Sequence, residues 1–216
     1  MGNGIENPGY LAFVDALIAG DLKLGQTLKQ DELCEVLGFS LSPMRETTTL
    51  LEAEGLITVR RRIGITIFYP DVKFVGNTFQ FRGMLEREGL AKFARSVDLD
   101  WVAKMQAEHE AIIDYVQRVG EPTIYREPVR LLEWDFHSRF VDAFENQQID
   151  TVYERLHQKM FLLRLVNPDA VDPASTTRSM SEHLALLDAL GKHDVQGALD
   201  ALDKHLQGVL HRILTT

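Results

Sequence analysis

The sequence lacks several features that define whole classes of proteins. It contains a single cysteine, Cys34, which excludes an internal disulfide and any zinc site built from several cysteines. It has no run of roughly 18 to 20 apolar residues, so we expect no membrane-spanning helix. The N-terminal segment has no basic stretch followed by a long apolar core, so we expect no secretory signal. These absences predict a cytoplasmic protein that does not act at a membrane.

Positive charge is scarce as well. The 216 residues include 23 Lys and Arg against 32 Asp and Glu, which gives a net charge of −9. This balance argues against a protein that coats nucleic acid through bulk charge, but it allows DNA binding through a small local patch. A hydrophobic content of 45% and a charged content of 25% are typical of globular proteins that bury a core. The length fits one large domain or two of ordinary size.

The sequence changes in character near residues 65–79, "ITIFYPDVKFVGNTF". Before this stretch the pattern predicts short helices followed by a β-branched segment, and after it helices alone. We therefore expect a first domain over residues 1–70, a linker over residues 71–76 and a second domain over residues 77–216.

Three helices are expected in the first domain. In "PGYLAFVDALIAG" the spacing of the apolar residues marks one helical face, made of Leu11, Val14, Leu17 and Ile18. "KQDELCEVLG" ends at Gly38 and "SLSPMRETTTLLEAEG" ends at Gly55, because glycine commonly follows a helix. The third helix has Ser42 as its expected N-cap and Pro43 at its first position.

The segment "LITVRRRIGITIFY" that follows predicts two strands around a turn. Three short helices and a hairpin are typical of a winged helix-turn-helix, although a small helical subdomain of another kind would give a similar pattern. In a winged helix-turn-helix, the N-terminal end of the recognition helix enters the major groove. Here that end carries Ser42, Arg45 and Thr49, whereas Met44, Leu51 and Thr48 are expected to face inward.

Four arginines are the candidate DNA contacts with a positive charge. Arg45 could donate two hydrogen bonds to guanine or contact a phosphate instead. Arg60, Arg61 and Arg62 concentrate positive charge at the predicted hairpin tip, where a wing meets the DNA backbone. Adjacent residues alternate faces on a strand, so one of the three could pack against the domain.

The second domain has no strand pattern, and its amphipathic segments predict an all-helical antiparallel bundle. Within it, "EWDFH" places Glu133 and His137 four residues apart, so that their side chains share one helix face. His183 and His205 lie beside leucines on two helices that the turn "GKHD" separates, at comparable distances from that turn. One carboxylate and three imidazoles form a suitable ligand set for zinc, nickel or manganese. The alternative is a polar core without metal.

The remaining histidines fit ordinary core or surface positions, and they are His109, His157, His193 and His211.

Two regions of the sequence resemble known families. The segment from Leu28 to Ile67, with "SLSPMRE" and "LEAEGLI", resembles the GntR family of bacterial transcription regulators. "FQFRGMLE", "FHSRFVDAFEN" and "SEHLALLDALGKHDVQGALDALDKHL" resemble the FCD ligand-binding domain of the FadR subfamily. The resemblance implies DNA contacts from Ser40 and the Gly64 wing. It also implies a divalent metal on Glu133, His137, His183 and His205.

The sequence departs from the family pattern at three positions. Glu133 stands where the family usually has Asp, Leu41 where it has Arg, and Thr48 where leucine is common. Glu133 is one methylene longer than Asp, and Leu41 removes an expected DNA contact.

The prediction is a ligand-responsive regulator that acts as a homodimer on double-stranded operator DNA. The metal would hold a small carboxylate effector, with Arg82 and Arg178 as candidate partners of that carboxylate. Arg82 precedes Glu86 by four residues, so a salt bridge within the helix is the competing explanation. We do not expect an enzyme. The alternatives are a metal-dependent enzyme with Glu133 as general base, or a metal-free regulator that binds a larger apolar effector.

Overall fold

The computed structural model describes residues 7–120, 128–166 and 172–215. The six N-terminal residues, on which part of the expectation about a secretory signal depends, lie outside these ranges. The chain divides into two compact units, Met1–Asp71 and Val72–Thr216. None of the described helices combines the length and the apolar character that crossing a bilayer requires.

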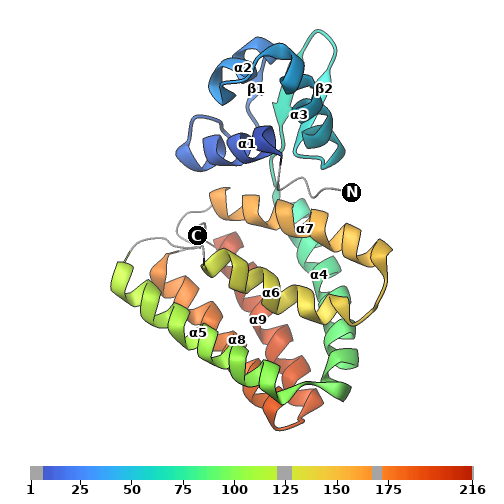
Figure 1. Ribbon diagram of the computed structural model, residues 1–216, viewed down its shortest axis with the longest axis vertical. Coiled ribbons are helices and arrows are strands. Elements are labelled where there is room, and N and C mark those ends of the chain that lie inside the picture. The colour runs from blue at the N-terminus through green and yellow to red at the C-terminus, as the bar shows by residue number, and fades with distance from the viewer. Residues whose placement is uncertain (1–6, 121–127, 167–171, 216) are drawn as a thin grey trace. The chain divides into compact units, whose positions relative to one another are not determined.

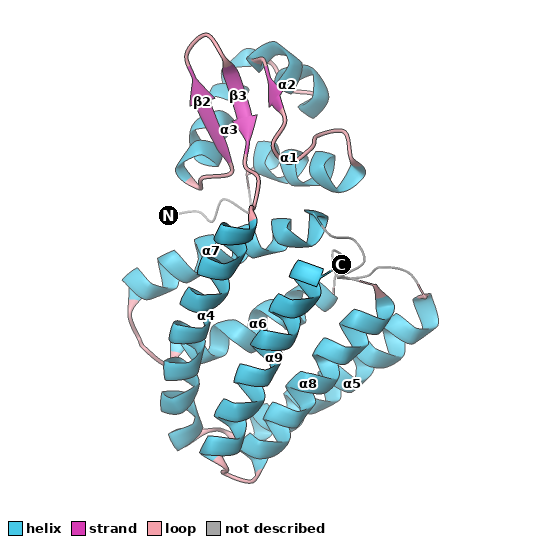
Figure 2. Cartoon of the chain, turned by 180° about the vertical axis from the view of Figure 1, so that it is seen from behind, coloured by secondary structure: helices cyan, strands magenta, loops and turns pink. Residues whose placement is uncertain are grey.

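The first unit is a winged helix-turn-helix, as the sequence predicted. Its elements, labelled in Figures 1 and 2, are α1 (Pro8–Ala19), β1 (Thr27–Leu28), α2 (Gln30–Leu37), α3 (Leu41–Ala53), β2 (Ile57–Arg60) and β3 (Gly64–Ile67). α2 ends at Gly38, whose φ of 71° is the left-handed conformation expected after a helix.

The predicted inward face of α1 was wrong in part. The helix begins after Asn7, whose side chain accepts hydrogen bonds from two backbone N–H groups of the first turn. Tyr10, Phe13 and Leu17 are buried, whereas Leu11 and Ile18 are more than 40% exposed. The two aromatic residues bury more apolar area than the aliphatic ones, and they set the rotation of the helix.

The start of α3 also differs from the prediction. Ser40, not Ser42, occupies the N-cap position, and Pro43 lies in the first turn, where proline is tolerated. Met44, Thr47 and Leu51 form its buried face. Thr48, which we expected to face inward, is half-buried and bonds to the carbonyl of Met44.

The predicted hairpin belongs to a three-stranded antiparallel sheet with the order β1-β3-β2. β2 and β3 pair with Arg60 opposite Gly64, and Leu28 of β1 lies opposite Ile65. A Cβ atom at Gly64 would lie 2.5 Å from the carbonyl oxygen of Leu28, and the φ of Gly64 is 127°. Glycine is therefore required where β3 passes β1.

Every regular element among the described residues of the second unit is a helix, and this confirms the predicted class. Its elements are α4 (Val72–Phe93), a short 3-10 helix η2 (Ala94–Ser96), α5 (Leu99–Val119), α6 (Val129–Asp142), α7 (Gln147–Val166), α8 (Pro173–Gly191) and α9 (Val195–Thr215). Residues 72–76, assigned to a linker from the sequence, form the first turn of α4. β3 ends at Ile67, and Pro70, which could not donate to a strand ladder, lies between it and α4.

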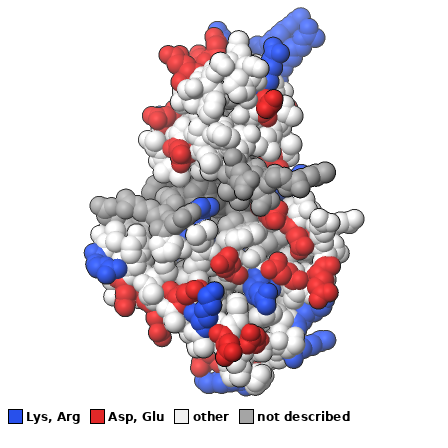
Figure 3. All heavy atoms as spheres, in the orientation of Figure 1, with Lys and Arg blue, Asp and Glu red and all other residues white. Residues whose placement is uncertain are grey.

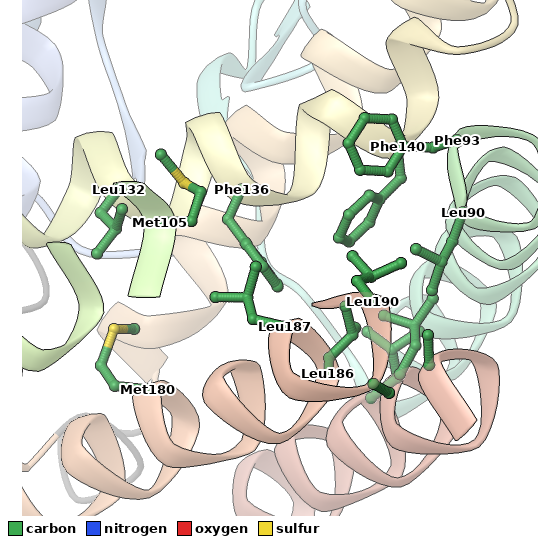
Figure 4. Packing of buried hydrophobic residues seen from close by; sticks show 14 of the residues in the cluster. Leu90, Phe93, Met105, Leu132, Phe136, Phe140, Met180, Leu186, Leu187 and Leu190 are labelled. Carbon is green, nitrogen blue, oxygen red and sulfur yellow. The ribbon is translucent and has the colours of Figure 1, made fainter. Parts of the chain in front are cut away.

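The core of this unit lies where α8 packs against α5 and α9, and where α4 packs against α6 and α9. Phe136 and Phe140 project from α6 into this core, Phe136 toward Leu187 of α8 (Figure 4). Leu90 and Leu190 are also buried there. This apolar packing fixes the helices that carry the candidate site.

Candidate metal centre

Three histidines from three helices meet inside the helical unit. His137 comes from α6, His183 from α8 and His205 from α9, and each is at most 2% exposed. Their candidate ligand nitrogens all lie within 4.8 Å of one another. The structure thus brings together the three histidines that the sequence selected. Glu133, the predicted fourth ligand, is buried one turn before His137, but it lies outside this group.

Two of the histidines have a carboxylate at Nδ1. His137 Nδ1 lies 2.9 Å from Glu86 Oε2, and His205 Nδ1 lies 2.8 Å from Glu182 Oε2. A charged carboxylate can only accept, so both Nδ1 atoms carry the proton and donate it. In a neutral imidazole this leaves Nε2 with a free lone pair. An acidic group at the rear nitrogen is the usual support of a metal-binding histidine.

The pKa values agree with charged carboxylates at Glu86 and Glu182 and with a neutral imidazole at His137. Burial raises the pKa of Glu86, but Arg82 and His137 outweigh it and hold this pKa well below its usual range. For Glu182, hydrogen bonds from His205 and Arg212 overcome burial and lower the pKa to about 2. Burial and the charge of Arg82 lower the pKa of His137 to about 4.

The Nε2 atoms of the three histidines, opposite their Nδ1 partners, are placed to bind a cation. His137 Nε2 is buried and has no hydrogen-bond partner among the described residues. His183 Nε2 and His205 Nε2 are 3.2 Å apart. Two nitrogens bound to one ion at about 2.0–2.1 Å would lie roughly 2.8 to 3.4 Å apart, depending on the bond angle. The donor set and its spacing therefore suit a divalent metal.

Glu86 also holds the two nearest polar groups. Arg82, one turn earlier on α4, forms a buried ion pair with it. The hydroxyl of Tyr153 on α7 donates to Glu86 Oε1 at 2.6 Å. Burial and the charge of Glu86 raise the pKa of Tyr153 well above its usual value, so the hydroxyl keeps its proton. The salt-bridge explanation for Arg82 is therefore realised, although the residue also lies beside the histidines.

Arg178 was predicted as a second effector contact, and the structure does not bring it to the site. It is exposed on α8, whereas His183 of the same helix is fully buried. Five residues correspond to about 140° of rotation around a helix, so the two side chains leave α8 on different sides.

The predicted DNA contacts lie on the surface of the first unit. Ser42, Arg45 and Thr49 form an exposed stripe on α3, opposite its buried face. Ser40 is exposed at the N-cap. Gly64 has the structural role at β1 described above, and its contact with DNA stays a prediction.

The hairpin tip carries the concentrated positive charge. Arg60, Arg61 and Arg62 are all exposed, and Figure 3 shows Lys and Arg atoms gathered at this end of the unit. Residues 1–71 contain six Lys or Arg and ten Asp or Glu. Half of the unit's Lys and Arg residues therefore lie in the wing. This is the kind of small positive patch that a protein with a negative net charge would need for DNA binding.

Sequence reasoning missed the residues that contact Nδ1 of the candidate ligands. They are Glu86 at His137, Glu182 at His205, and His109, whose Nε2 lies 3.0 Å from His183 Nδ1. His109 lies on the face of α5 that also buries Met105 and Ile112, so its periodicity could have indicated an inward position. Nothing in the local sequence relates Glu86 to His137, because the two residues are 51 positions apart.

Comparison with known proteins gives a family match for each of the two units. Residues 10–67 match the family described as bacterial regulatory proteins of the gntR family, and residues 77–208 match the FCD domain. The chain is 25% identical over 195 residues to the uncharacterized HTH-type transcriptional regulator YdhC of Bacillus subtilis, covering 88% of this chain and 84% of that protein.

Solved structures have the same fold. A GntR transcriptional regulator from Rhodococcus sp. RHA1 superposes with a TM-score of 0.69 at 20% identity, over 96% of this chain and 97% of that one. The metal-free FCD domain of TM0439 gives a TM-score of 0.51 at 25% identity, over 67% of this chain and 94% of that one. The chain therefore belongs to the GntR family of DNA-binding transcription regulators, in the subfamily with a C-terminal FCD domain, and not to a family of enzymes.

Proposed function

We propose that this regulator binds operator DNA as a homodimer, and that its helical unit holds one divalent metal together with a small carboxylate effector. The main support for the proposed metal site is the group of three buried imidazoles. Their donors lie within 4.8 Å of one another, and one of them, His137 Nε2, has no partner among the described residues. A buried polar atom without a partner costs about 1–3 kcal/mol, which a bound cation would recover.

His137, His183 and His205 would supply nitrogen ligands, and Glu133 remains the proposed carboxylate ligand. Glu133 lies one turn from His137 on α6, so a change of its side-chain rotamer could direct an oxygen toward the ion. Three imidazoles with one carboxylate suit zinc, nickel or manganese. The metal would act as a Lewis acid that binds ligand oxygens, and no step of turnover is proposed.

The effector is proposed to be a small carboxylate, because its oxygens could complete the coordination of the metal. Arg82 is the only Lys or Arg that is buried among the described residues, and it is the candidate for the second interaction with that carboxylate. Because Glu86 already pairs with Arg82, an effector would have to share this guanidinium. Arg178 is not retained in the proposal.

The test is elemental analysis of protein purified without chelator or His-tag. We expect about one equivalent of transition metal in the wild type and none in His183→Ala. His211→Ala is the matched control, because His211 is exposed on α9. Glu133→Gln should retain metal with lower affinity if Glu133 is a ligand. Absence of metal from the wild type, even after zinc, nickel or manganese is added, would leave the histidines as a polar core.

A metal-free regulator with a larger apolar effector is the competing proposal. Thermal shifts with small carboxylates, before and after removal of the metal by chelator, separate the two. We expect the shifts to disappear with the metal. Effector affinity that survives chelation would favour the apolar alternative.

The homodimer is proposed because a helix-turn-helix protein with two-fold symmetry reads two half-sites about one DNA turn apart. The effector would change operator affinity only by its difference in affinity for the two states. Light scattering should give twice the chain mass of 24.5 kDa. The proposed action on operator DNA also implies a cytoplasmic location, which stays part of the proposal.

A further inference from the structure

His183 differs from the other two histidines because the group behind it is another histidine. His183 Nδ1 lies 3.0 Å from His109 Nε2, and His109 Nδ1 lies 2.7 Å from the carbonyl oxygen of Met105. The two rings come from α8 and α5, and both are 0% exposed. A chain of two imidazoles therefore connects the site to the backbone of α5.

The backbone carbonyl sets the direction of every hydrogen bond in this chain. The oxygen of Met105 has no proton, so it can only accept, and His109 Nδ1 must donate. A neutral His109 then has a lone pair at Nε2, which accepts from His183 Nδ1. His109 is fully buried, which favours the neutral form of its ring.

The position of the proton on His183 also determines the state of its Nε2 atom, which faces His205. With its proton on Nδ1, a neutral His183 has an unprotonated Nε2, which lies 3.2 Å from His205 Nε2. Glu182 fixes the proton of His205 on Nδ1 in the same way. When His205 is neutral as well, two lone pairs face each other at hydrogen-bond distance with no proton between them, an arrangement that a cation would stabilise.

Aromatic contacts fix the orientation of the two rings. Phe136 stacks on His183, with centroids 4.3 Å apart and an interplanar angle of 24°. The same phenylalanine meets His109 edge-on at 5.0 Å. His109 and His183 are nearly perpendicular, at 78°. The imidazole of His109 therefore has a fixed place and plane behind its neighbour.

We propose that His109 is a positioning residue of the metal site: it fixes the Nδ1–H tautomer of His183, so that the Nε2 lone pair points to the metal position. The proposal rests on the metal binding proposed above. It gives each histidine ligand its own acceptor at the rear nitrogen, namely Glu86 for His137, His109 for His183 and Glu182 for His205.

The competing arrangement has a proton between His183 and His205. It requires a His183 whose proton is on Nε2, in which case His109 and His183 would have two lone pairs facing each other, or an imidazolium at His183 or His205. Full burial among other imidazoles disfavours an imidazolium at His183, and an imidazolium at His205 would donate to His183 Nε2 and leave the proposed tautomer of His183 unchanged.

The direct test is the tautomer of His183 in the metal-free protein. Long-range ¹H–¹⁵N correlation spectra of ¹⁵N-histidine-labelled protein distinguish the two ring nitrogens, and His183→Ala assigns the resonance among the seven histidines of the chain. We expect the Nδ1–H form for both His109 and His183. An Nε2–H form or an imidazolium at His183 would overturn the proposal, whether or not the protein binds metal.

A pair of variants tests the consequence for the ion. His109→Leu removes the acceptor, and we expect zinc affinity to fall about 10- to 100-fold, with His183 no longer held in one tautomer. His109→Gln offers an amide oxygen in place of Nε2 and should restore most of the affinity and the Nδ1–H form. His211→Leu, at an exposed position of α9, is the control.

The outcomes separate this proposal from the one on which it rests. Wild-type protein that takes no zinc but shows the Nδ1–H tautomers would remove the metal function and leave the hydrogen-bond chain standing. Zinc bound equally by the wild type and by a folded His109→Leu would keep the metal and overturn the role of His109. If His109→Leu does not fold, His109→Gln and the wild-type spectra still decide the matter.

Discussion

The two units of this regulator differ in where their candidate functional side chains lie: exposed on the surface in the first unit and buried in the second. Among the described residues of the first unit, Thr47 is the only buried polar or charged residue apart from tyrosine. The second unit buries nine: Thr78, Arg82, Glu86, His109, Glu133, His137, Thr176, His183 and His205. The first unit has an apolar interior and presents its functional groups to solvent, whereas the second encloses them.

This difference has energetic consequences. An exposed arginine in the wing remains hydrated, so we expect its removal to affect the proposed DNA binding more than folding. A buried charge must be paired, because an ion without a partner in the interior costs several kcal/mol. In the helical unit the residues that would bind the metal therefore also contribute to the stability of the fold.

The largest expected effect is that of Glu86→Gln, which tests this coupling in the helical unit. The change leaves Arg82 buried without its carboxylate, and breaking a buried pair in this way costs about 3–5 kcal/mol. Urea unfolding should show the loss, and the variant should also bind zinc more weakly because His137 loses its charged acceptor. Glu88→Gln, exposed on the same helix, should change stability by less than about 0.5 kcal/mol. Equal stability of wild type and Glu86→Gln would contradict the comparison.

The next effect is that of Leu51→Ala in the first unit. Leu51 is 0% exposed, and truncating a buried leucine costs about 2–5 kcal/mol. Hydrogen exchange should increase over residues 8–67, and operator binding should weaken, while zinc content per chain stays unchanged.

Leu11→Ala is the matched control for this variant, because Leu11 of α1 is 44% exposed. A loss of zinc in Leu51→Ala would mean that the two units do not keep their functions separate.

A smaller effect is expected from Arg45→Ala, which tests whether surface chemistry in the first unit acts without a cost in stability. A two-hydrogen-bond contact to guanine contributes about 1–3 kcal/mol, or roughly 5- to 150-fold in operator affinity. Gel-shift titration on DNA from the chain's own promoter region should show this loss, with no change in unfolding. Lys23→Ala removes another exposed cation of the same unit and should bind as the wild type does. A uniform loss on all sequences would make Arg45 a phosphate contact instead.

The smallest effect is expected from Arg61→Gln at the wing. One lost phosphate contact reduces the slope of log affinity against log salt by about 0.9. Binding should weaken alike on specific and nonspecific DNA, and stability should stay the same. An unchanged slope would mean that Arg61 does not contact DNA, and the same measurement on Arg60→Gln and Arg62→Gln would identify which arginines do.

Much of the first unit was accessible to sequence reasoning because its signals are local. Gly38 after a helix and the β-branched residues around three arginines indicate their structures within a few positions. Errors occurred where two neighbouring residues competed for one role, as at Ser40 and Ser42, or where α1 could rotate to bury Phe13 instead of Leu11. β1 has only two residues, and its pairing with β3 spans 39 positions of sequence between Thr27 and Thr66.

By itself, the sequence determined the fold class, the family and the three histidines that meet in the helical unit. Periodicity, turn residues and motif order are local properties, and His137, His183 and His205 each stand on the apolar side of their own helix. Only the tertiary structure decided what stands behind them: Glu86, His109 and Glu182, and the separation of Arg178 from the site. Those contacts depend on the rotation and packing of helices far apart in the chain, and no spacing within a single helix determines that packing.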